Sequence, residues 1–335
     1  MNDGEIYISA KEDLGGGMSA TARGGFTMRG RGSAIMDRDA SVSLAGSFGA
    51  LTAGSVRTCG TLVTVQSGAV TGTAYSSNES NNYLPLDKCS MVDVVAYSIP
   101  VGPVMLTATY GEFASPVGYS IAAATTSTLA VTQSLDSKGN TNGITFTDVA
   151  AVYSGGPIMA GVNVTTFAAA TNKSLGTLSG YLTPADGVIR TRLVGTYDAG
   201  VAKFGLGYQN KTGGFADQYV ASVAVPLGNI MLGLDYTARA AQGALDRGTT
   251  GAGAAYALGQ MRDGDKASSS IGLGATYNFS KTTSLNASYI TYTDAGANGK
   301  YSAAVQTSSI VGTNTTGTTA ALLDTEYRVR LLKSF

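Results

Sequence analysis

Alternation of apolar and polar residues with a period of two is the feature that most constrains the fold of this chain. It recurs in stretches of about ten residues from one end of the sequence to the other. In the closing stretch EYRVRLLKSF, Tyr327, Val329 and Leu331 alternate with Arg328 and Arg330. Successive side chains of a β-strand point to opposite faces, so the pattern predicts an all-β protein made of two-faced strands.

The segments between the alternating stretches have two lengths, which follow each other in turn. Tight segments such as YDAGVAK and VPLGNI contain Gly or Asp, and long polar ones cover 57–91, 115–142, 170–187, 240–268 and 295–324. This order predicts antiparallel hairpins with tight turns at one end and long loops at the other. Outer-membrane barrels have short periplasmic turns and long extracellular loops. A soluble sandwich or solenoid also alternates, but its turns are not sorted by length in this way.

The residue types on the two faces also favour a membrane barrel. One face carries Leu, Ile and Val, with Tyr at strand ends, whereas the other carries Arg, Lys, Gln, Thr and Gly. In an outer-membrane barrel the apolar face contacts lipid, the polar face lines a wet interior and aromatic residues lie at the interfaces. We therefore expect residues 1–335 to form a single transmembrane β-barrel in a bacterial outer membrane. The terminal Phe335 is similar to the signal read by the barrel-assembly machinery, an expected partner.

Composition excludes several other classes of protein. Lys+Arg and Asp+Glu both number 22, so the chain lacks the basic field of a nucleic-acid binder. It has no His, which removes Ser-His and Cys-His nucleophile pairs and the commonest metal ligand. No apolar run reaches the length of about 18 residues needed for a spanning helix. We expect no enzymatic activity, cofactor, metal or nucleic-acid partner.

Several stretches in order resemble the trimeric general porins of Gram-negative, chiefly β-proteobacterial, bacteria. They are SAKEDLGGGMSATA, DRDASVSLAGSFGALTAGS, VDVVAYSIPVGPVMLTATYGE, VGTYDAGVAKFGLGYQNK and YRVRLLKSF. The resemblance implies about 16 antiparallel strands, an even number as in bacterial barrels. Fifteen candidate strands are visible, and the first is similar to the family's second. We expect the missing strand and a signal peptide upstream of Met1, or an additional strand within 119–133.

The resemblance also implies that one long loop folds into the lumen as a constriction, and its position in the chain corresponds to 57–91. Cys59 and Cys89 lie near the two ends of this loop. A disulfide closing about 30 residues would contribute roughly 3–4 kcal/mol on the chain-entropy model. Two free thiols, or a disulfide that only protects a surface loop, are the alternatives. Within the loop, the charged candidates for the constriction are Glu79, Asp87 and Lys88.

Basic residues on the polar face predict a pore that prefers anions, because rings or ladders of Arg and Lys attract anions. The candidate pore-lining residues are Lys11, Arg23, Arg29, Arg31, Arg190, Arg192, Lys203, Lys211, Arg239, Arg328 and Arg330. Asp39 and Asp235 are the acids expected on the same face. If loop acids such as Glu79 and Asp87 pair with the basic residues, the pore is instead nearly unselective.

These observations predict an outer-membrane porin that passes small anionic or neutral hydrophilic solutes by passive diffusion. The resemblance further implies a homotrimer in contact with outer-membrane lipid and lipopolysaccharide. Two alternatives stay open. The first is a channel specific for small organic anions or sugars, which would need an aromatic track inside the lumen. The second is a structural or adhesive surface barrel whose long loops carry the function.

Overall fold

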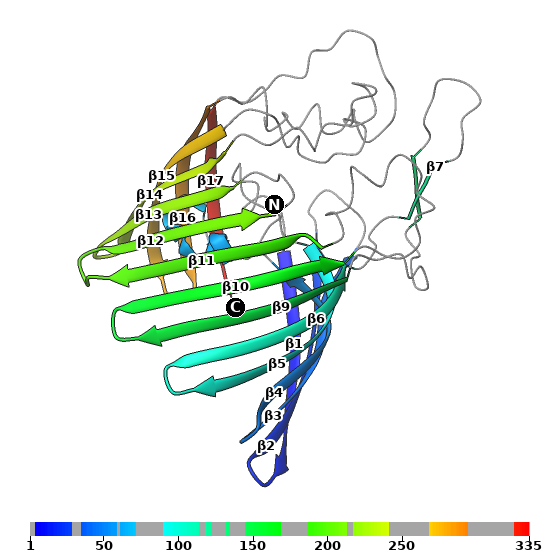
Figure 1. Ribbon diagram of the computed structural model, residues 1–335. Helices are drawn as coiled ribbons and strands as arrows, with labels where there is room; N and C mark the ends of the chain where they lie inside the picture. Colours follow the sequence, from blue (N-terminus) through cyan, green and yellow to red (C-terminus); the bar gives the residue numbers. More distant parts are fainter. Residues whose placement is uncertain are drawn as a thin grey trace.

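Fifteen strands form one antiparallel sheet in which each strand pairs with the next (Figure 1). The computed structural model describes residues 4–28, 35–58, 61–71, 90–113, 118–121, 131–134, 145–168, 187–212, 217–240, 268–293 and 325–334. The strands of the sheet are β1 (Gly4–Gly15), β2 (Met18–Met28), β3 (Ile35–Gly46), β4 (Gly49–Thr58), β5 (Ser90–Val101), β6 (Val104–Phe113), β9 (Thr145–Gly155), β10 (Ile158–Ala168), β11 (Ile189–Asp198), β12 (Lys203–Lys211), β13 (Gln218–Leu227), β14 (Ile230–Arg239), β15 (Ser268–Ser280), β16 (Thr283–Thr293) and β17 (Thr325–Lys333). This architecture confirms the all-β prediction.

All tight turns lie at one end of the sheet, as their alternation with long loops predicted. The β5–β6 and β13–β14 connections take two residues each, and Gly102 and Gly228 supply the positive φ that these turns require, 59° and 61°. The strands contain 9 to 13 residues, the length that crosses a bilayer when strands tilt by about 45°. We therefore take the tight-turn end as periplasmic and the opposite end as extracellular.

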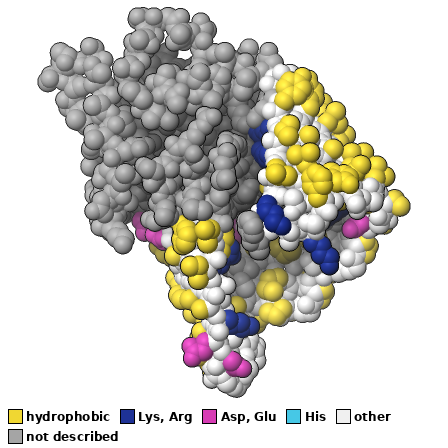
Figure 2. All heavy atoms as spheres, turned by 180° about the vertical axis from the view of Figure 1, so that it is seen from behind, with side chains coloured by type: hydrophobic (Ala, Val, Ile, Leu, Met, Phe, Trp, Pro, Cys, Tyr) yellow, Lys and Arg dark blue, Asp and Glu magenta, His cyan; other side chains and the backbone are white. Residues whose placement is uncertain are grey.

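Apolar side chains cover the outward face of the sheet and polar side chains occupy the inward face. Leu206 and Val329 are 66% and 74% exposed, whereas the inward Gln209 and Asn286 are fully buried. Figure 2 shows hydrophobic side chains spread over the outer surface of the strands. Most of the Lys and Arg side chains visible in this view lie around the recess between the two coloured parts of the molecule. A water-soluble protein with so large an exposed apolar surface would aggregate, so this inside-out distribution fits a bilayer.

The segment 119–133 does not add a strand to the main sheet. Strands β7 (Gly118–Ile121) and β8 (Val131–Ser134) form a separate two-stranded sheet, while β6 pairs directly with β9. This expectation was wrong for a topological reason: a loop that leaves and returns at the same end of a barrel adds an even number of crossings. In the part of the chain that the structure describes, no helix is long and apolar enough to cross a membrane.

The two edges of the main sheet, β1 and β17, run in the same direction because fourteen antiparallel steps separate them. Among the described residues no pairing joins these two edges. An unpaired strand edge is very unfavourable in hydrocarbon. Purely antiparallel closure therefore needs an odd number of strands between β17 and β1.

Candidate functional site

A short segment of the loop after β4 lies against the inward face of the sheet. It consists of the 3-10 turn η1 (Thr61–Val65) and the single helical turn α1 (Gly68–Thr71). The turn η1 contacts β11, β12 and β13, and α1 contacts β14, β15 and β16. The part of the predicted constriction loop that the structure describes thus folds into the lumen. We call residues 61–71 the inner segment.

Three side chains of the wall form hydrogen bonds to the backbone of the inner segment. The amide N–H of Ser67 donates to Oδ1 of the buried Asp235 over 2.8 Å. Asn286 Nδ2 donates to the carbonyl oxygen of Ala69 over 2.7 Å. The hydroxyl of Ser222 donates to the carbonyl oxygen of Val65. Because these bonds start from β13, β14 and β16, they fix the inner segment along three separate strands.

Inward glycines of the wall make room for the inner segment. A Cβ atom added at Gly205 would overlap the carbonyl oxygen of Val65, and one at Gly274 would lie 2.6 Å from Cα of Val70. At Gly207 it would lie 2.8 Å from Cδ2 of Leu62. Real Cβ atoms do not approach other atoms so closely. The sequence pattern only placed glycines on the polar face, and the structure shows that these three contact another part of the chain.

An apolar patch on the inner wall completes the contact. Leu62 and Val65 of η1 pack against Val220 of β13, and the partly buried Met159 and Val194 lie beside them. Their alternation places Met159, Val194 and Val220 on the inward face. Burial of such side chains contributes about 1.5–3 kcal/mol each. The inner segment is therefore held by apolar packing as well as by hydrogen bonds.

The predicted basic residues that the structure describes lie at several depths along the inward face. Lys203 is near the periplasmic turn, Arg23 is in the middle of β2, and Arg190 pairs with Lys211 near the extracellular end. Their surroundings differ, since Arg192 is 5% and Arg328 7% exposed, whereas Lys11, Arg23 and Lys203 are exposed. The half-buried residues are Arg190, Lys211 and Arg330. The backbone of Arg239 pairs with Gln218.

Several predicted site residues lie outside the residues that the structure describes. These are Arg29, Arg31, Cys59, Glu79, Asp87, Lys88, Cys89 and Phe335. For these residues the sequence-based expectations stand as predictions.

A hydrogen-bonded network across β9, β10 and β11 contains an acid that sequence reasoning missed. Asn163 Nδ2 donates to both carboxylate oxygens of Asp148 over 2.6 Å, and Thr165 Oγ1 also donates to Asp148. Arg190 donates to Thr165 Oγ1 over 3.0 Å, and its guanidinium lies 5.1 Å from the ring centroid of Phe167. The network fixes Asp148 and partly neutralises the upper basic wall.

Arg23 has a different environment from Arg190. Its guanidinium carbon lies 4.1 Å from the ring centroid of Tyr7, an inward residue of the neighbouring strand β1. This cation–π contact orients the side chain without neutralising its charge. Among the residues that the structure describes, Arg23 has no carboxylate partner. The period-two alternation places Tyr7 and Arg23 on the same face of the sheet. Their contact follows from the strand register, in which Arg23 pairs with Ser9, two residues from Tyr7.

Comparisons with known proteins agree with this inside-out sheet. The family described as Gram-negative porin matches residues 1–299. Among solved structures, a triple-substituted variant of Rhodopseudomonas blastica porin has a TM-score of 0.52 at 13% identity, covering 86% of this chain and 84% of that chain. Another Rh. blastica porin variant gives 0.51 at 14% identity with the same coverage. These identities are low, so the structural likeness concerns the fold. A comparison with curated proteins finds no match.

Proposed function

Because this chain belongs to the Gram-negative porin family, we propose that its lumen passes small hydrophilic solutes and prefers anions to cations. The protein is an outer-membrane porin, and porins are diffusion channels rather than enzymes. Size selection is assigned to the inner segment, because it occupies lumen space against β11–β16. Charge selection is assigned to the basic residues that contact lumen water.

The position and exposure of Arg23 are the main support for the proposed anion preference. It lies at the middle of β2, and the inner segment meets Gly274 at the middle of β15. Both positions are therefore at mid-depth, where the inner segment narrows the lumen. Arg23 is exposed, Tyr7 orients it, and the narrow path focuses its field. Lys11 adds a second exposed positive charge nearer the periplasm.

The two inward acids that accept these hydrogen bonds lie on β14 and β9, which do not neighbour β2 in the sheet. Asp235 is buried and accepts a hydrogen bond from Ser67 of the inner segment. Asp148 accepts hydrogen bonds from Asn163 and Thr165 in the upper wall. Both carboxylates thus have structural partners, whereas Arg23 faces the lumen. This difference supports a net attraction of anions at mid-depth.

The anion preference is tested in planar lipid bilayers. In a tenfold KCl gradient at low ionic strength, the purified protein is expected to conduct in steps, with a reversal potential on the anion-selective side. Low salt is needed because screening at about 1 M reduces the range of the field to roughly 3 Å. A cation-selective reversal potential would overturn the charge assignment, whereas absence of conductance would overturn the channel itself.

The same proposal includes a disulfide between Cys59 and Cys89. Thr58 of β4 and Ser90 of β5 are direct cross-strand partners, and the two cysteines are the next residues beyond this pair. Neighbouring antiparallel strands hold opposite Cα atoms about 4.5–5.5 Å apart, which suits a disulfide. The bond would fix the base of the loop that carries the inner segment.

A homotrimer, contact with lipopolysaccharide and assembly by the barrel-assembly machinery complete the proposal. The outward face of β2 and β3 carries the small side chains Ala20, Ala22 and Ala40. Small residues let neighbouring surfaces approach closely inside a membrane, which supports association through this part of the barrel. The terminal aromatic Phe335 supports recognition by the assembly machinery.

A further inference from the structure

One row of side chains on the inward face of β9–β12 carries charges of both signs. In the cross-strand register Asp148 of β9 pairs with Thr165 of β10, which pairs with Arg190 of β11. Arg190 in turn pairs with Lys211, the last residue of β12. The row therefore has an acid at one end and two bases at the other, and its basic end lies near the extracellular end of the strands, opposite the tight β11–β12 turn.

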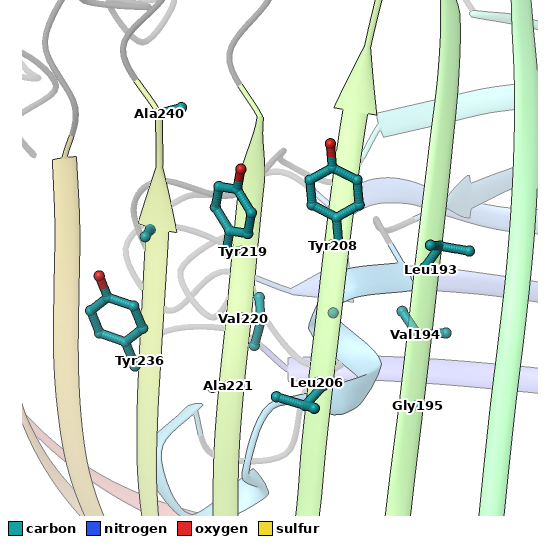
Figure 3. Close-up of a pocket in the computed structure, with 12 residues that line it drawn as sticks. Leu193, Val194, Gly195, Leu206, Tyr208, Tyr219, Val220, Ala221, Tyr236 and Ala240 are labelled. Atoms are coloured by element: carbon teal, nitrogen blue, oxygen red, sulfur yellow. The ribbon is translucent and has the colours of Figure 1, made fainter.

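The charged side chains of this row belong to the wall of the lumen. Figure 3 shows Tyr208 on β12 among the outward side chains of β12–β14. Lys211 has the opposite parity on the same strand and therefore points inward. Asp148, Arg190 and Lys211 are half-buried, so part of each side chain stays accessible.

Hydrogen bonds and packing hold Asp148 and Arg190 in place beside each other. Asn163 Nδ2 donates to both carboxylate oxygens of Asp148, and Thr165 Oγ1 donates to Oδ1. An ionised carboxylate offers about four acceptor positions, so these three bonds leave one for a solute. Arg190 Nη2 donates to Thr165, and its guanidinium lies over the ring of Phe167. The two opposite charges are thus fixed on either side of one hydroxyl group.

We propose that this row binds short peptides with free amino and carboxyl ends. The ammonium group of the solute donates to Asp148, and its carboxylate accepts hydrogen bonds from Arg190 or Lys211. Strands of a sheet lie about 4.8 Å apart, so the backbones of β9 and β11 are separated by roughly 10 Å. An extended tripeptide also spans roughly 10 Å. The inference rests on the proposed diffusion channel and names a solute class for its extracellular half.

Solutes that carry a single charge fit this row less well. An anion near Arg190 and Lys211 is repelled by Asp148, and a cation near Asp148 is repelled by the two bases. A zwitterion of matching length makes both attractive contacts at once. The row therefore favours zwitterions, whereas the anion preference is assigned to Arg23 at mid-depth.

Block of the ionic current by triglycine tests the proposal. The purified protein is recorded in planar bilayers in dilute KCl near pH 7, where both ends of triglycine are charged. N-acetyltriglycine, which keeps only the carboxylate, and triglycine amide, which keeps only the ammonium group, are the matched probes. Triglycine is expected to halve the current at a concentration about threefold or more below that of either analogue, the factor typical of one further ion pair at a partly exposed position.

Two sets of variants assign this difference to the row. Asp148→Asn should abolish the advantage of triglycine over N-acetyltriglycine, and Arg190→Gln with Lys211→Gln should abolish its advantage over triglycine amide. Asp198→Asn and Lys203→Gln are the controls, because they remove the same charges from a cross-strand pair of β11 and β12 at the periplasmic end. Both controls should keep both advantages, and the conductance steps of each variant show that it forms a pore.

The possible results separate this inference from the channel itself. Equal half-blocking concentrations for the three probes, or an advantage of triglycine over N-acetyltriglycine that survives Asp148→Asn, would overturn the inference and leave the row as an internal contact of the wall. A loss of both advantages in the control variants would also overturn it. A protein that conducts without preferring triglycine would leave the diffusion channel standing, whereas a wild-type protein that does not conduct would overturn both.

Discussion

Replacing Arg23 with glutamate is expected to lower the anion-to-cation permeability ratio by up to about a hundredfold. The change removes one positive charge and adds one negative charge, a difference of two unit charges. At about 6 Å in a water-like medium, each unit contributes roughly 0.7 kcal/mol to the energy of a passing ion. The sum of about 1.4 kcal/mol disfavours an anion and favours a cation by the same amount, so their energies differ by about 2.8 kcal/mol more than before. This difference corresponds to a factor of roughly a hundred. Reversal potentials in a dilute KCl gradient measure the effect.

Lys203→Glu provides the matched control for this prediction. It makes the same change in net charge, also at an exposed inward position, but near the periplasmic turn. We expect its effect on the permeability ratio to be less than a third of that of Arg23→Glu. Equal effects would mean that the total charge of the lumen, and not the mid-depth position of Arg23, sets the selectivity.

Replacing Gly274 with alanine is expected to release the inner segment from the wall. The added Cβ atom would lie 2.6 Å from Cα of Val70 and would overlap the carbonyl group of Ala69. Relief of such an overlap costs about 1–3 kcal/mol, which raises the released population roughly 5- to 150-fold. Release also breaks the bonds from Asp235 and Asn286. Single-channel recordings should then show a second level of higher conductance.

Gly195→Ala tests whether this effect is specific. Gly195 also lies within a strand of the sheet, but a Cβ atom there would be 3.7 Å from the carbonyl oxygen of Met159, an ordinary contact. This variant should keep the single conductance level of the wild type. If Gly274→Ala behaves in the same way, the inner segment does not depend on its contact with β15.

The sequence was sufficient to predict the strands and their two faces. The period-two pattern correctly predicts the outward and inward side chains of β17 (325–333), β11 (189–198) and β15 (268–280). Alternating short and long connections also predicted that each strand pairs with its neighbour in sequence. The signal is strong because every residue of a spanning strand must suit one of two very different environments.

The internal contacts of the site depend on register and loop conformation, which one sequence does not encode locally. Asp148 and Arg190 are linked only because Thr165 lies between them in the pairing of three strands. The period-two pattern identifies Gly205 and Gly274 only as inward residues. Their contacts with the inner segment are visible only in the folded structure. The segment 119–133 has the composition of a strand, but its ends lie at the same side of the barrel.

The most direct test of this account concerns the orientation of the two faces. Thr109→Cys and Ala108→Cys change neighbouring residues of β6 that point inward and outward, respectively, in a background with Cys59→Ser and Cys89→Ser. With the protein in membranes, a charged water-soluble thiol reagent should modify the cysteine at position 109 and leave the one at position 108 unmodified. Modification at 108 with protection at 109 would mean that the apolar face is not in lipid, and it would contradict a water-filled lumen.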